Sequence, residues 1–111
     1  MSAASDEMAA RIRAILGARP DVVEKKMFGG VGFMLNGNML AGSTAKGALM
    51  VRVSPEGLDA AVARPGASVM HMGDKPMKGF ISVTDEGIET DEALADWLAF
   101  SEDYVRTLPA K

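Results

Sequence analysis

The sequence contains no cysteine, which excludes disulfide bonds, thiolate zinc sites and cysteine nucleophiles together. It has no apolar run near the roughly 20 residues that a membrane-spanning helix requires. The first residues also lack the basic segment followed by an apolar segment that marks a secretory signal. We therefore expect a cytoplasmic protein with no membrane partner.

Phosphate-binding glycine motifs are missing as well, although residues 25–42 hold five glycines. No Gly-Lys-Ser or Gly-Lys-Thr occurs, so a Walker-type phosphate loop is excluded. Gly30 and Gly32 precede an apolar run and a turn, whereas a dinucleotide fingerprint needs a third glycine and a helix. We predict no bound cofactor.

Acidic residues outnumber basic ones by 15 to 12, so the net charge is −3. Non-specific affinity for nucleic acid comes from many Lys and Arg contacts to phosphate, and this balance argues against a protein that coats DNA. With 111 residues, of which 48% are hydrophobic, the chain suffices for one core but not for two. We predict a single domain over residues 1–111.

Catalytic and metal chemistry finds little support in the remaining polar residues. His71 is the only histidine, and neither a nucleophile nor an orienting carboxylate accompanies it. Met70 and Met72 flank it as Cu(I) ligands could, yet strand alternation sends neighbours to opposite faces. The acidic stretches 85–92 and 101–103 lack the EF-hand pattern. We expect no enzyme, no catalytic residue and no metal site.

Helix and strand signals alternate along the chain. Capping residues and closing Gly or Pro residues predict helices over 5–17, with Ser5 as cap, from Ser54 and Pro55 to Pro65-Gly66, and from Thr90 to Pro109. Turn signals at Asn36-Gly37, which suits a type I′ turn, at 44–47 and at 73–78 separate apolar runs. Those runs predict strands over 26–35, 38–44, 48–53, 67–72 and 79–83.

The order of these elements is α-β-β-β-α-β-β-α. Too few helices alternate with strands for a parallel α/β fold. We therefore predict an α+β two-layer sandwich, in which helices pack on one antiparallel sheet of about five strands.

Three glycines in the first run have a steric interpretation. Gly30 and Gly32 lie two residues apart and face the same way in a strand, whereas Gly29 faces the other way. A row without side chains lets a helix or another backbone approach closely. We favour close packing, and a small-molecule pocket over this row is the open alternative.

Basic residues cluster at two places in the sequence. Lys25 and Lys26 lie at the start of the first predicted strand, and Lys75 and Lys78 lie in the predicted turn over 73–78. If these two parts of the sheet are neighbours, the lysines form a modest basic patch that could meet phosphate or an acidic protein surface. Scattered solubilising charge is the other interpretation. The candidate interaction surface consists of Lys25, Lys26, Phe28, Arg52, Lys75 and Lys78.

The order and spacing of several segments resemble the N-terminal domain of the TfoX/Sxy family, named for a regulator of natural competence in bacteria. These segments are 25–42, Leu49 to Val53, Met77-Lys78-Gly79 and the closing 94–109, and the resemblance spans residues 8–109. It implies a compact α+β domain with one antiparallel sheet. It implies no enzymatic activity, and it brings no ligand, catalytic or DNA-contact residue.

Members of that family promote transcription of DNA-uptake genes and carry a second, helical domain. A chain that ends at Lys111 leaves no room for that domain, so we expect a stand-alone copy. The resemblance implies a regulatory or adaptor domain that contacts a protein partner, such as the transcription machinery or a regulator. Direct nucleic-acid binding through the lysines is a less favoured alternative, and a homodimer formed through an exposed sheet edge is a further expectation.

Overall fold

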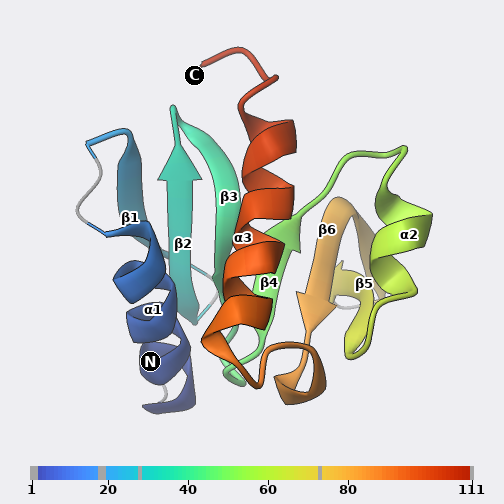
Figure 1. Ribbon diagram of the computed structural model, residues 1–111, viewed down its shortest axis with the longest axis horizontal. Coiled ribbons are helices and arrows are strands. Elements are labelled where there is room, and N and C mark those ends of the chain that lie inside the picture. Colours follow the sequence, from blue (N-terminus) through green and yellow to red (C-terminus); the bar gives the residue numbers. More distant parts are fainter. Residues whose placement is uncertain (1–2, 18–19, 28, 73, 111) are drawn as a thin grey trace.

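The computed structural model describes residues 3–17, 20–27, 29–72 and 74–110 (Figure 1). These residues form three α-helices, one 3-10 helix and six strands. In chain order the elements are α1 (Ala3–Leu16), β1 (Val22–Met27), β2 (Gly30–Leu35), β3 (Asn38–Ser43), β4 (Leu49–Arg52), α2 (Leu58–Val62), β5 (Ala67–Met72), β6 (Lys75–Val83), η1 (Asp85–Gly87) and α3 (Asp91–Val105). None of the helices described has the length and apolar character needed to cross a membrane.

Within the described residues the six strands form one antiparallel sheet in the order β1-β2-β3-β4-β6-β5. The α+β class is confirmed, but the expected number of about five strands is wrong. The predicted strand over 26–35 is two strands, because Gly29 has φ +77 and turns the chain between them. As an edge strand, β1 carries Glu24, Lys25 and Lys26 in sequence and so lacks the hydrophobic alternation that marks an interior strand.

The predicted turn over 73–78 is also wrong, because β6 already begins at Lys75. Its first residues pair only with β5, through His71–Pro76 and Met72–Lys75. The pairing with β4 begins at Phe80. Pro76 therefore lies where one side of the strand has no described neighbour, and its missing N–H is tolerated there.

Two helix starts differ from their predicted caps. Ser5 is not a cap, because α1 begins at Ala3 and the buried Ser5 hydroxyl lies 3.0 Å from the hydroxyl of Ser43. Ser54 does not cap α2 either. Its hydroxyl accepts a hydrogen bond from the Gly57 N–H at 3.0 Å within a turn that precedes the helix.

Other local predictions are confirmed. Asn36 and Gly37 both have positive φ, at 53° and 84°, as a type I′ turn requires. The Thr90 hydroxyl accepts a hydrogen bond from the Ala93 N–H at 3.0 Å and caps α3. Gly17, with φ +66, follows the last residue of α1.

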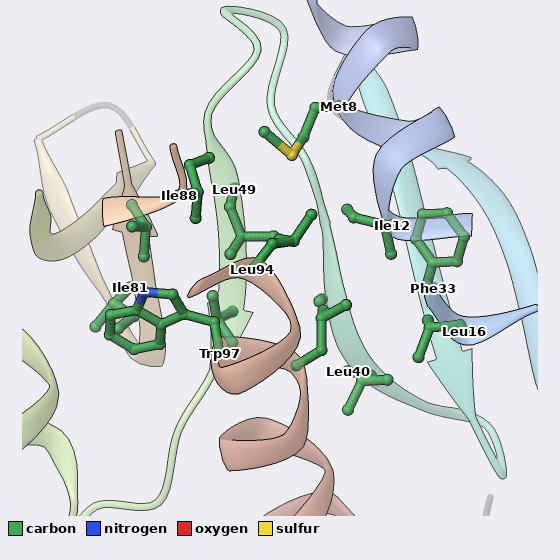
Figure 2. Close-up of a cluster of buried hydrophobic side chains, with 14 of the residues drawn as sticks. Met8, Ile12, Leu16, Phe33, Leu40, Leu49, Ile81, Ile88, Leu94 and Trp97 are labelled. Carbon is green, nitrogen blue, oxygen red and sulfur yellow. The ribbon is translucent and has the colours of Figure 1, made fainter. Parts of the chain in front are cut away.

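The core lies between the sheet and the two longer helices. Figure 1 shows α1 and α3 side by side in front of the sheet, and α2 next to β5 and β6. Figure 2 shows α1, α3 and the strands contributing to one apolar cluster, and its labelled members are Met8, Ile12, Leu16, Phe33, Leu40, Leu49, Ile81, Ile88, Leu94 and Trp97. These side chains fill the space between the sheet and the helices.

Arg11 joins the first helix to the last. Its guanidinium donates to the carbonyl oxygen of Ile88 at 2.8 Å and lies 3.5 Å from a carboxylate oxygen of Asp91. The contact satisfies a carbonyl just before α3 and places a cation beside an acid in the first turn of that helix. Arg11 thereby holds α1 beside the start of α3.

Candidate functional site

The first group of candidate residues lies on β1, the outermost strand at one side of the sheet. Lys25 pairs with Gly32 and Lys26 with Val31, and both lysine side chains are exposed. In the described sheet β1 pairs with β2 alone, so its other edge carries unpaired backbone groups. Phe28, predicted as part of the same surface, lies outside the described residues.

A bidentate ion pair holds this edge strand to the helix layer. Arg13 of α1 donates from Nε and Nη2 to the two carboxylate oxygens of Glu24, at 2.8 and 2.6 Å. These hydrogen bonds hold the pKa of the Glu24 carboxyl below its ordinary value of 4.5, although partial burial opposes the shift. The pair orients β1 beside α1 while Lys25 and Lys26 stay in solvent.

Substituting Glu24 with glutamine tests this pair through its pH dependence. A lowered pKa in the folded state means that the carboxylate stabilises the fold above pH 4.5 and loses that effect as the pH falls through the lowered pKa. The side chains of Arg13 and Glu24 are 51% and 38% exposed, so solvent weakens the pair. At neutral pH the free energy of unfolding of the wild type should therefore exceed that of E24Q by less than about 1 kcal/mol. Urea unfolding at a series of pH values measures the difference.

The exposed Glu86 supplies the control, since it has no ion-pair partner among the described residues. The difference in the free energy of unfolding between E24Q and the wild type should shrink in acid. The free energy of unfolding of E86Q should match that of the wild type at every pH. A difference for E24Q that persists unchanged below the lowered pKa would contradict the assignment.

The second group of candidates lies elsewhere in the sheet. Lys75 begins β6 and is exposed, and Lys78 lies in the same strand. Arg52 ends β4 opposite Phe80, and its guanidinium carbon lies 5.6 Å from the centre of the Phe80 ring. Arg52 therefore has a structural partner of its own.

The structure does not bring the two lysine groups together. Strands β2, β3 and β4 separate β1 from β6, and four inter-strand steps of about 4.8 Å amount to roughly 19 Å. The groups also lie at opposite ends of the strands. The register carries Lys26 across the sheet to the level of Val83 at the end of β6, whereas Lys75 lies at its start. One continuous basic patch across the sheet is not formed.

The glycines around the first turn have two different roles. Gly29 takes the left-handed conformation of the β1–β2 turn. A Cβ added to Gly30 would overlap the carbonyl oxygen of Ser43, so the backbone of β3 occupies that space. Gly32 pairs with Gly42 across β2 and β3. Backbone lies against backbone at Gly30, which leaves no room there for the alternative of a small-molecule pocket.

His71 has a local structural contact. It is exposed, and its Nδ1 lies 3.0 Å from the carbonyl oxygen of Val69. A register shift between Val69 and His71 interrupts the regular alternation of β5 on which the prediction of its facing relied. No group of three or more histidine, aspartate or glutamate residues suitable for a metal occurs among the described residues.

One feature was missed by sequence reasoning, namely a pocket of about 620 Å³. The turn between β3 and β4 forms one side, and residues of β5 and β6 form the other. Ser68, Ser82 and Thr84 contribute hydroxyls to it. The alternation of Ser82 and Thr84 with apolar residues indicated that both hydroxyls face away from the core. No local feature of the sequence indicated that the β3–β4 turn would lie opposite them.

A match to a family model decides the family. Residues 14–104 match the TfoX N-terminal domain. The chain belongs to the TfoX N-terminal domain family. The matched residues of this TfoX N-terminal domain include the whole sheet, from β1 to β6, nearly all of α3 and only the last three residues of α1. Neither curated proteins nor solved structures gave a match to it.

Proposed function

We propose that this TfoX N-terminal domain is a non-enzymatic bacterial regulatory or adaptor domain, which acts in the cytoplasm through protein–protein contacts. Membership of the family supports a role connected with the regulation of competence, the uptake of DNA. The proposed partner is a component of the transcription machinery or a regulator. Because the two lysine groups lie apart, binding of a protein at one edge of the sheet fits the molecule better than binding of nucleic acid along a continuous basic surface.

The open edge of β1 carries the proposal. An extended segment of a partner can add to such an edge through main-chain hydrogen bonds, and neighbouring side chains then supply specificity. Val23 is 54% exposed, which is unusual for a large apolar residue of this domain, and Lys25 and Lys26 follow it. The edge therefore fits an extended segment that presents an apolar side chain together with acidic ones.

Charge reversal on β1, compared with charge reversal on β6, tests the proposal. Tagged wild type, K25E/K26E and K75E are used for affinity capture from the native lysate, with nuclease present and at low and moderate salt. K75E is the matched control, because it reverses an exposed lysine on β6, far from β1. We expect one partner protein to be captured by wild type and by K75E in the presence of nuclease. The same protein should not be captured by K25E/K26E.

The same experiment separates the nucleic-acid alternative. Contacts to phosphate would make capture sensitive to nuclease and to salt, with each contact contributing about one unit to the slope of log affinity against log salt. Capture lost with nuclease, or equal capture by K25E/K26E and wild type, would contradict the assignment of β1.

A further inference from the structure

The pocket of about 620 Å³ lies on the face of the sheet that points away from α1 and α3. Ile81 and Val83 point into the core, and Ser82 between them therefore points to the other face. Ser68 is the cross-strand partner of Ser82, so both hydroxyls line the same surface. The volume is within the roughly 300–1,000 Å³ range of small-molecule sites.

Opposite charges lie at the rim of this pocket. Lys46 belongs to the β3–β4 turn and Asp85 to η1, and both also border a smaller neighbouring pocket. Both residues are exposed, and neither has an ion-pair partner among the described residues. One cationic and one anionic group are thus available at the same rim.

Neutral polar groups and apolar surface complete the lining. The carbonyl oxygen of Val69 can only accept, so the His71 Nδ1 that lies 3.0 Å away must carry the proton. In the neutral ring, Nε2 is then left as an acceptor. The hydroxyls of Ser68 and Ser82 can donate or accept, and Met70 adds an apolar surface.

We propose that this pocket binds a free α-amino acid with a small or apolar side chain. Its carboxylate would be bound by Lys46 and its ammonium group by Asp85. The hydroxyls of Ser68 and Ser82 would form further hydrogen bonds to these two groups. A simple anion such as phosphate would meet the negative charge of Asp85, and a simple cation would meet Lys46. A zwitterion is the class of small molecule that satisfies both, and this activity lies beyond the proposed protein contacts at β1.

Titration of the whole chain with the common free L-amino acids, one at a time, tests the proposal by backbone-amide NMR. We expect saturable shifts for at least one amino acid, concentrated at residues 44–48, 68–71 and 82–85. The N-acetyl and the carboxamide derivatives of that amino acid should each bind about ten-fold more weakly, because each lacks one charge-assisted contact.

Variants assign the two charges. K46M and D85N should each weaken binding about ten-fold or more, whereas K75M, at an exposed lysine outside the pocket lining, should leave binding unchanged. All three positions are exposed, so folding should survive. The proposal is overturned if no amino acid gives saturable shifts, if the derivatives bind as tightly as the parent, or if inorganic phosphate displaces the amino acid.

Discussion

Replacing Trp97 with alanine is expected to remove about 3–5 kcal/mol from the free energy of unfolding. The indole is 1% exposed, and its removal leaves a cavity between α3 and the sheet. The Arg64 guanidinium carbon lies 3.9 Å from the centre of the Trp97 ring, and Phe100 meets the indole edge-on at 6.0 Å between ring centres. A domain of this size has a total stability of about 5–15 kcal/mol, so the loss is a large share.

Urea unfolding followed by far-UV circular dichroism measures the change. Arg64→Met is the companion variant, because it removes the cation but keeps much of the side-chain packing over the ring. It should cost about 0.5–2 kcal/mol, less than W97A. A loss below about 1 kcal/mol for W97A would show that the indole does not fill the core as described.

The second large effect is expected from Gly30→Ala, which should cost at least about 2 kcal/mol. A Cβ at this position would overlap the carbonyl oxygen of Ser43 and lie 2.8 Å from its carbon, so main chain rather than a flexible side chain must move. That movement also disturbs the hydrogen bond from the Val31 N–H to the Ser43 hydroxyl, which is 3.1 Å long. Urea unfolding and amide hydrogen exchange at Val31 report the two effects.

Gly17→Ala separates this contact from conformational strain. Gly17 has φ +66 and open space around it, so alanine there should cost about 1–2 kcal/mol through backbone strain alone. In G17A the exchange of Val31 should change only as far as global stability does, whereas G30A should accelerate it further. Equal exchange in the two variants would contradict the close approach of β2 and β3.

The local signals that the sequence carries were reliable where a residue's own chemistry decides the structure. Asn36 and Gly37 tolerate positive φ and form the predicted hairpin turn, and Thr90 accepts the hydrogen bond that starts α3. Ser5 carries the same kind of signal as Thr90, yet its hydroxyl contacts Ser43 from inside α1. The difference arises because a buried tertiary partner competes with the local cap.

Sequence reasoning failed where backbone has a paired strand on one side only. An edge strand is exposed on more of its surface, so β1 needs no regular alternation of apolar residues and its sequence did not indicate a strand. The start of β6 was hidden by Pro76, which is tolerated there because no strand pairs with its other side in the described sheet. Both errors changed the number or length of the strands, while the antiparallel α+β class remained correct.

Sequence patterns alone were sufficient for the α+β class, for the turn at Asn36 and Gly37 and for the Thr90 cap of α3. Turn chemistry and apolar periodicity act over a few residues and can be read without the fold. The positions of the surface residues relative to one another could not be predicted, because strand order is set by contacts between residues far apart in the chain. That order moved Lys26 away from Lys75 and brought Lys46 to the same pocket rim as Asp85.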